Sequence, residues 1–260
     1  MSDGLEIDIA ATLPYGDEPW GEPKQWSSSV DGYAAAALLA ELGIVRAASA
    51  FEDYLQGIIA ELDRAGCPAP PSLKVDLLER VFARLAIDLS NRPSLDLVRF
   101  FDCARNCIVH QMGRANAELV ELGAESGLTK AMASLTPRAA AKWKPAIPTI
   151  SLGETVMWRP RHAIMASDAY YKVAVAIDKV FIATLEDGRL VAMAAYWAVA
   201  APFTIVEAKR SLIATLRSAL NDRYLVKIKA TEIGPILKSV NKWEQAKSSF
   251  HARNRDRPID

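Results

Sequence analysis

The segment ARNCIVHQMGRAN, residues 104–116, carries the side chains with the most reactive chemistry in the chain. It places Arg105, Asn106 and His110, one of only three histidines, within six residues of one another. An imidazole transfers protons near pH 7, a guanidinium binds a phosphate through paired N–H donors, and an amide can orient either group. These groups suit phosphodiester chemistry. In RNA the 2′-hydroxyl is itself a nucleophile, so neither a metal nor a protein nucleophile is required.

Helical spacing predicts how these side chains lie together. Asn106 and His110 are four residues apart, so they share one face of a helix, and the long side chain of Arg105 can reach that face from its flank. Gly113 follows shortly and favours a helix end. The partial negative charge of a helix C-terminus stabilises the cationic forms of His110 and Arg105.

The elements that must hold this segment are predicted to be mainly helices. Residues 1–30 are rich in proline, glycine and serine and read as a loop, with at most a short strand at 5–10. Prolines and β-branched residues predict a loop and a strand or hairpin at 142–158, and a further short strand is expected at 224–229. Apolar periodicity predicts helices at about 33–64, 73–89, 95–112, 115–122, 128–141, 162–186, 189–201, 205–220 and 231–248.

This order of elements predicts an all-α fold. Three long helices in succession and a fourth after an insertion favour an antiparallel helical bundle with a small strand-containing insertion. We expect three parts: an acidic loop-rich segment at 1–32, the bundle at 33–188, and a helical C-terminal appendage at 189–260.

Charge is unevenly distributed, although the formal net charge of the chain is zero. Residues 1–32 hold seven acidic residues and one lysine, whereas residues 207–260 hold twelve basic and six acidic residues. A basic C-terminal part can meet phosphates or the acidic N-terminal part, and ordinary solvated helix faces would show the same composition.

A second basic segment, WRPRHAI, offers Arg159, Arg161 and His162 as a further substrate-binding patch. The arginines would grip a phosphate backbone, and Trp158 would stack on a base. The alternative reading is the start of a helix with solvated arginines.

The number of cysteines and the hydropathy of the chain indicate the cellular compartment. Three cysteines suit a reducing environment, and Cys103 and Cys107, four residues apart, read as small core residues. Zinc would need further ligands nearby, so we expect no metal and no cofactor. The acidic start of the chain predicts no secretory leader. The apolar run 190–206 is short for a membrane span and contains Pro202, so we expect a buried helix and a cytoplasmic protein.

The segment RNCIVH, residues 105–110, resembles the R-x(4–6)-H motif of HEPN domains, in which a polar residue, often asparagine, follows the arginine. Its setting is also similar, on a third helix, after AFEDYLQGI (50–58) in the first helix and before DAYYKVAVAIDKVFIATL (168–185). The resemblance covers about residues 33–186 and leaves out both ends of the chain.

The resemblance implies a helical bundle that forms a homodimer, with two R…H motifs facing one cleft. It implies a metal-independent endoribonuclease acting on RNA, in a toxin–antitoxin, abortive-infection or anti-phage setting, with an antitoxin or defence-complex partner. Arg105 would bind the scissile phosphate, His110 would transfer protons, and Asn106 would position substrate or His110. Glu52 on the first helix would reach Arg105 and orient it. Products would carry a 2′,3′-cyclic phosphate and a 5′-hydroxyl.

Two other classes of function stay open from the sequence. One is a HEPN bundle that binds RNA, a nucleotide or a protein without cleaving. The other is a DNA-binding regulator acting through the C-terminal part, whose basic, partly aromatic composition is compatible with a winged helix.

Overall fold

The computed structural model describes residues 32–68, 76–88, 93–135, 145–202 and 210–253. Within these ranges the chain forms α-helices and one π-helical turn, so the all-α prediction is confirmed. The elements are α1 (Gly32–Arg64), α2 (Leu77–Leu85), α3 (Pro93–His110), α4 (Ala117–Ala124), α5 (Ser126–Ser134), α6 (Pro160–Thr184), α7 (Asp187–Ala195), the π-helical turn η2 (Tyr196–Ala200), α8 (Leu212–Tyr224), α9 (Ala230–Ser239) and α10 (Trp243–Arg253).

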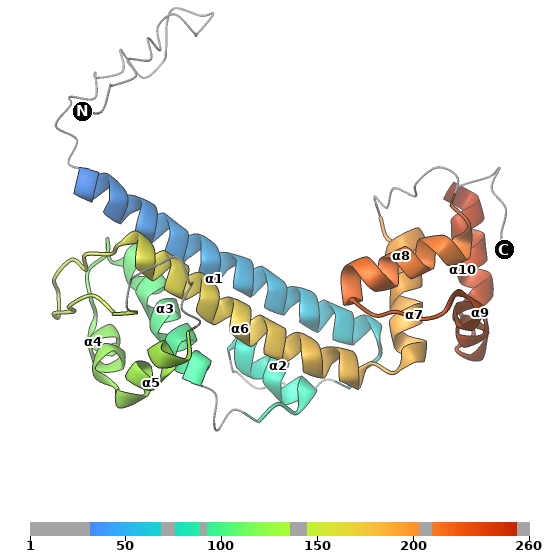
Figure 1. Cartoon of the computed structure of the whole chain (residues 1–260), viewed down its shortest axis with the longest axis horizontal. Coiled ribbons are helices and arrows are strands. Elements are labelled where there is room, and N and C mark those ends of the chain that lie inside the picture. Colours follow the sequence, from blue (N-terminus) through green and yellow to red (C-terminus); the bar gives the residue numbers. More distant parts are fainter. Residues whose placement is uncertain (1–31, 69–75, 89–92, 136–144, 203–209, 254–260) are drawn as a thin grey trace, which may run out of the picture.

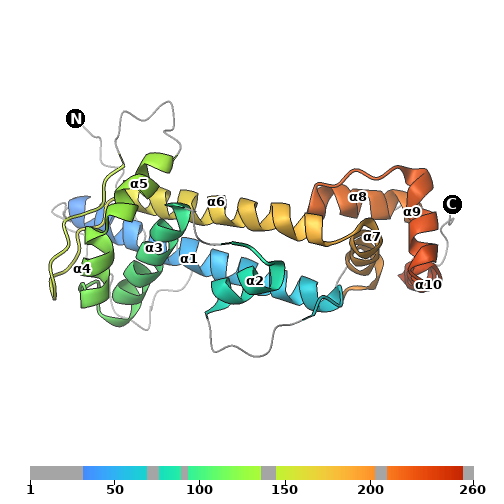
Figure 2. The same ribbon diagram turned by 90° about the horizontal axis from the view of Figure 1, so that it is seen from below.

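The two long helices α1 and α6 pack side by side along the long axis of the bundle (Figure 1, Figure 2). Gly43 allows their close approach, because a Cβ at this position would lie 2.8 Å from the Cβ of Ala163. Further along, the Tyr54 hydroxyl donates to Asp178 Oδ1 at 2.7 Å and lies 3.1 Å from the Ala174 carbonyl oxygen. Early residues of α1 therefore meet early residues of α6, and the two helices run parallel.

Helix α3 packs against both long helices in the opposite direction. Arg105 lies near Glu52, whereas Gly113, just beyond α3, lies near Glu41. The predicted antiparallel arrangement thus holds for α3 against α1 and is wrong for α6 against α1. The physical reason is that α3 ends, and α6 begins, at the same end of α1, where residues 113–115 pair with residues 153–156, so α6 reverses the direction of α3 and has that of α1.

The core explains why these segments are helical. In α1 the buried residues recur every three or four positions, which places them on one stripe facing α3 and α6. That stripe consists of Ala40, Ile44, Ala48, Phe51, Leu55, Ile58 and Leu62. The shorter α2 begins at a defined cap, where the Glu79 amide donates to Asp76 Oδ1 at 2.7 Å.

The predicted strands are absent from the described residues. Residues 145–159 are irregular and make one isolated antiparallel bridge, Arg114 to Thr155. Their backbone groups pair with the turn after α3; the Val156 amide, for example, donates to the Gly113 carbonyl at 3.0 Å. The predicted hairpin within 142–158 is therefore not formed by the described residues 145–158. Residues 225–229 form no strand, and Leu225 at their start has a left-handed backbone with φ +55°. The predicted helix 231–248 is divided into α9 and α10. The possible strand at 5–10 lies outside the described residues.

Helices α7–α10 pack mainly on one another and meet the end of α1 through Glu61. This carboxylate is only 5% exposed and accepts three hydrogen-bonding side chains from the C-terminal helices. Trp197 Nε1 donates at 2.6 Å, Arg223 Nη2 at 2.6 Å and the Tyr224 hydroxyl at 2.8 Å. The guanidinium of Arg223 also lies 4.0 Å from the centre of the Trp197 ring. One buried acid therefore connects the C-terminal helices to the bundle. The division of the chain into three parts stays a prediction.

Among the described helices, α1 is long and apolar enough over Ala34–Arg64 to cross a membrane by length and composition. One stripe of it packs inside the bundle, and 22% of its most apolar 18-residue window is buried; one such helix is weak evidence for a membrane span. The apolar run that begins at residue 190 is indeed buried where it is described, in α7 and η2.

Candidate active-site cleft

Helix α3 presents Arg105 and Asn106 beside its buried face. Leu97, Phe101 and Ala104 are fully buried, so the next residue along, Arg105, lies on the flank with 31% of its side chain exposed. Its Nη1 donates to Asn106 Oδ1 at 2.9 Å, and its Nη2 lies 3.7 Å from Glu52 Oε2 on α1. The expected contact between Glu52 and Arg105 is therefore present, and the guanidinium is held between two helices.

A cleft of about 340 Å³ opens between α3, the middle of α1 and the start of α2. Phe51, Leu55 and Phe82 contribute to its apolar floor. Its polar lining holds four carboxylates and two guanidiniums, with Asn106 beside them: Glu52, Asp76, Glu79, Asp102, Arg99 and Arg105. The cleft thus brings Arg105, Asn106 and Glu52 together, and it does not include His110.

Asp102 is the most perturbed acid of this cleft. It lies on α3 one turn before Arg105 and accepts a hydrogen bond from the Tyr170 hydroxyl of α6 at 2.7 Å. Burial raises its pKa to about 6, although the Tyr170 hydrogen bond and the charge of Arg105 lower it. The negative charges of Asp76 and Glu52 raise it further. A carboxyl group that titrates near neutrality inside a cleft is suited to proton transfer.

This shift predicts a pH-dependent effect of Asp102→Asn. The folded carboxyl binds a proton at about pH 6 and the unfolded one at about pH 4, so the folded state holds more protons between these values. Wild-type stability therefore falls as the pH rises through this window. Asparagine keeps an acceptor for Tyr170 and cannot ionise, so we expect the variant to gain about 2 kcal/mol relative to wild type between pH 4 and pH 7.

Urea unfolding of both proteins at several pH values measures this difference. The matched control is Asp53→Asn, which removes one carboxylate at an exposed position of the same bundle and leaves the Asp102–Tyr170 hydrogen bond in place. A pH-independent difference for Asp102→Asn would show that its carboxyl is not perturbed.

His110 is the last residue of α3 and is exposed. It is one helical turn beyond Asn106 and nearly on the same face, whereas five residues separate it from Arg105 by roughly 140° around the axis. The helix ends here because the Gly113 amide turns back to the Cys107 carbonyl at 3.0 Å, with Gly113 at φ +76°. Arg105 and His110 therefore both reach solvent, but from different sides of the end of α3.

The predicted second patch is divided between the interior and the surface. Arg159 is exposed and Arg161 is half-buried, but His162 is only 1% exposed. The Arg159 amide donates to His162 Nδ1 at 2.9 Å, so Nε2 carries the proton and donates to the Ala146 carbonyl at 3.0 Å. Arg161 Nε lies 3.2 Å from the same Nε2, which cannot accept its proton in this tautomer.

Burial also fixes the charge state of His162, since it lowers the pKa to about 4, with Arg161 and Arg159 lowering it further. The neutral imidazole holds the start of α6 and packs edge-on against the buried Trp158, 5.6 Å between ring centres. His162 and Trp158 therefore face the interior, where they cannot contact a substrate. Of the patch, the two arginines stay available.

The sequence reasoning missed Asp102 and Tyr170. Asp102 could have been found, because it is three residues before Arg105 and so falls on the same side of the helix. Tyr170 could not, since only packing brings it from 68 positions away. Cys103 and Cys107 are buried, as expected of core residues, and burial raises the pKa of the Cys103 thiol to about 12.

Comparison of the chain with protein family models, with curated proteins and with solved structures finds no match.

Proposed function

We propose that this chain is a metal-independent endoribonuclease of the HEPN type. The observation that carries the proposal is the placement of the R…H pair at the exposed end of α3. Arg105 lies at a cleft, fixed by Glu52 and Asn106, and His110 is exposed one turn beyond Asn106. Both side chains are thus reachable by a polymer; because they lie roughly 140° apart around α3, the proposal relies on the second motif of a dimer to bring an arginine and a histidine to one phosphate.

In the proposed reaction the 2′-oxygen of RNA attacks the adjacent phosphorus as its proton leaves. The bond from phosphorus to the 5′-oxygen breaks, and that oxygen takes up a proton. Arg105 binds the phosphoryl oxygens and offsets the charge that develops on them. His110 serves the proton transfer, taking the proton of the 2′-hydroxyl or giving one to the leaving 5′-oxygen. Asn106 holds Arg105 through the observed hydrogen bond. The products are a 2′,3′-cyclic phosphate and a 5′-hydroxyl.

Glu52 suits a positioning role for Arg105. The ion pair is long, at 3.7 Å, and both side chains are partly exposed, so it contributes little stability. A phosphate can therefore displace it at low cost. Until then, Glu52 keeps the guanidinium turned toward the cleft.

A homodimer would bring two such motifs together, and exposed apolar side chains around His110 support it. Met112 is 90% exposed and Val109 is 49% exposed, on either side of His110. Gly113 lies near Glu41 on α1, and Leu38 and Leu42 on either side of Glu41 are 56% and 57% exposed. Uncovered apolar side chains at this density mark interaction sites, and a second copy of this surface would cover them.

We expect Met112→Glu to weaken the dimer and to lower cleavage together, because a charge would be buried at the interface. Leu225→Glu is a closely matched control, since Leu225 is 84% exposed and has φ +55° against φ +54° for Met112. Sedimentation velocity across a concentration series measures the dimer. A Met112→Glu protein that dimerises like the Leu225→Glu control would contradict this interface.

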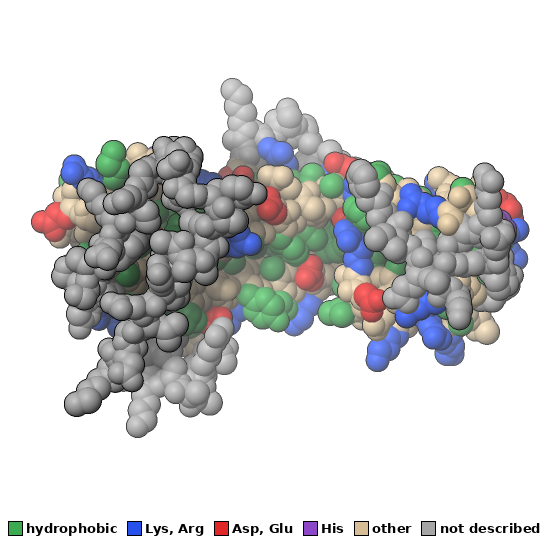
Figure 3. Space-filling view, turned by 90° about the horizontal axis from the view of Figure 1, so that it is seen from above, with side chains coloured by type: hydrophobic (Ala, Val, Ile, Leu, Met, Phe, Trp, Pro, Cys, Tyr) green, Lys and Arg blue, Asp and Glu red, His purple; other side chains and the backbone are tan. Residues whose placement is uncertain are grey.

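The acidic lining of the cleft favours a second candidate, a HEPN module that binds a partner without cleaving RNA. Four carboxylates against two arginines repel a polyphosphate inside the cleft and suit a cationic partner. On the nuclease proposal, RNA would instead approach from the open end of α3. The basic C-terminal helices, where Lys and Arg side chains gather in Figure 3, would then guide RNA or a partner.

Incubation of the purified protein with RNA in excess EDTA distinguishes these functions. We expect cleavage, and mass spectrometry of the fragments should identify 2′,3′-cyclic phosphate ends. Cleavage that needs Mg²⁺, or that leaves 3′-hydroxyl ends, would remove the mechanism. Salt-dependent binding of RNA without cleavage would favour the non-catalytic module. Salt-dependent binding of duplex DNA without cleavage of RNA would favour the DNA-binding regulator. A cytoplasmic toxin–antitoxin or defence setting rests on the family resemblance.

A further inference from the structure

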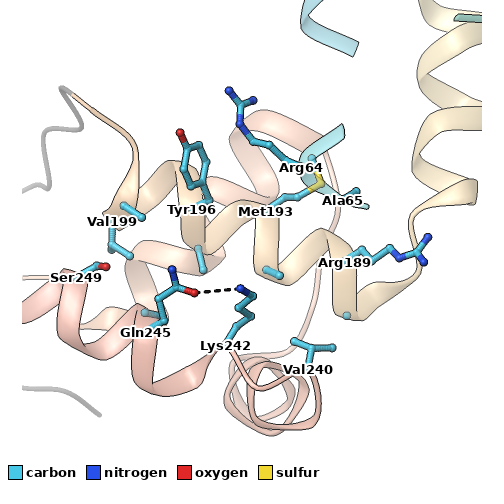
Figure 4. A pocket seen from close by; sticks show the side chains of 15 residues that line it. Arg64, Ala65, Arg189, Met193, Tyr196, Val199, Val240, Lys242, Gln245 and Ser249 are labelled. Atoms are coloured by element: carbon cyan, nitrogen blue, oxygen red, sulfur yellow. Dashed lines mark hydrogen bonds between the residues drawn. The ribbon is translucent and has the colours of Figure 1, made fainter. Parts of the chain in front are cut away.

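A second pocket lies at the junction of the bundle with the C-terminal helices (Figure 4). Its volume is about 390 Å³, and it lies between the end of α1, α7, η2 and α10 with the turn that precedes α10. It shares no lining residue with the cleft beside Arg105. The volume falls in the range of small-molecule sites, which is about 300–1,000 Å³.

Small side chains and a distorted helix make this space. Ala192, Ala195 and Ala246 line it where larger residues would fill it, and Met193 and Val199 give it apolar walls. The π-helical turn η2 forms part of the wall, closing with the Ala201 amide on the Tyr196 carbonyl at 2.7 Å. Single π-helical turns are uncommon and occur frequently at functional sites.

The charges around the pocket have one sign. Arg64, Arg189 and Lys242 line it, and no carboxylate does among the residues that the structure describes. Lys242 Nζ reaches into the pocket and donates to Gln245 Oε1 at 3.1 Å, as Figure 4 shows. None of the three cations forms an ion pair with a described carboxylate, since their described partners are an amide, a thiol and aromatic rings.

We infer that this pocket binds an amphipathic carboxylate, a small molecule with one anionic head and an apolar body. The positive rim attracts the head, and Lys242 with Gln245 offers it charge-assisted and neutral N–H donors. The alanine, methionine and valine walls take the apolar body. A neutral apolar ligand would leave the cations without an anionic partner, and a small inorganic anion would leave the apolar walls exposed to water.

Isothermal titration calorimetry with sodium decanoate tests this inference on the full-length protein. We expect saturable 1:1 binding, with decanol and acetate each at least about ten-fold weaker, because each lacks one half of the recognition. Lys242→Ala combined with Arg189→Ala should weaken decanoate about ten-fold or more, and Arg80→Ala, an exposed arginine outside the pocket, should leave it unchanged. Ala192→Leu, which narrows the pocket with three further carbon atoms, should weaken binding of decanoate.

Equal binding of decanol and decanoate would overturn the inference, because the charges would then play no part. So would decanoate binding that survives both the charge variant and Ala192→Leu, or no saturable binding. If Ala192→Leu fails to fold, the exposed Lys242 and Arg189 still give a decisive comparison. The readout needs no RNA cleavage, so it stands or falls separately from the proposed nuclease.

Discussion

Arg105→Ala should lower the rate of RNA cleavage in EDTA by ~100- to 1,000-fold, the effect of removing one preorganised donor from a charge-stabilising site. The fold should survive, because the Arg105 side chain is 31% exposed and its pair with Glu52 is long. Arg105→Lys should recover part of the rate at most, since an ammonium keeps the charge but cannot bind a phosphate through two parallel bonds.

His110→Ala should cost a similar factor, about 100- to 10,000-fold, as expected for loss of a proton-transfer group. His110 is exposed at the end of α3, so this substitution too should leave the free energy of unfolding nearly unchanged. Initial rates on a fluorescent RNA, measured by single-turnover kinetics, separate this loss of chemistry from a loss of binding.

Matched controls make these two variants informative. Arg80→Ala removes an exposed arginine from α2 outside the cleft, and His251→Ala removes an exposed histidine from α10. Both should cleave RNA like wild type. Cleavage that persists in Arg105→Ala and His110→Ala would remove the R…H site. Equal losses in all four variants would mean that charge on the surface, rather than this site, governs RNA contact.

Glu61→Ala should destabilise the protein by about 1–3 kcal/mol, the cost of leaving a buried donor without its acceptor, since the Arg223 side chain is 44% exposed and can be hydrated. The substitution leaves Trp197 Nε1, the Arg223 guanidinium and the Tyr224 hydroxyl without their acceptor at once. The buried Tyr224 hydroxyl is the main source of the loss, because Arg223 and Trp197 are partly exposed. Since these three donors come from η2 and α8, the C-terminal helices should loosen first.

Urea unfolding followed by tryptophan fluorescence measures this loss, because Trp197 lies inside the network. Glu121→Ala, at an exposed glutamate of α4, is the control and should change stability by less than about 0.5 kcal/mol. Glu61→Gln keeps the size and one acceptor oxygen, so it should fall between the two. A Glu61→Ala protein as stable as the control would show that the C-terminal helices do not depend on this acid.

The sequence by itself determined the helices and the R…H segment. Helical periodicity is local, so the apolar stripe of α1 and the i, i+4 relation of Asn106 and His110 follow from spacing alone. The family resemblance, rather than spacing, placed Glu52 near Arg105, and the structure has the two side chains 3.7 Å apart. The strand predicted at 224–229 from its β-branched residues is wrong, because no neighbouring strand among the described residues pairs with it.

Tertiary packing alone decided the rest. It made α1 and α6 parallel, buried His162, and brought Tyr170 to Asp102 and Glu61 to three donors from helices far along the chain. It also created the cationic pocket, whose walls come from four separate elements. The physical reason is that a perturbed pKa, a buried ion pair or a cavity depends on what lies across a packed interface, and neighbouring residues in the sequence do not specify that partner.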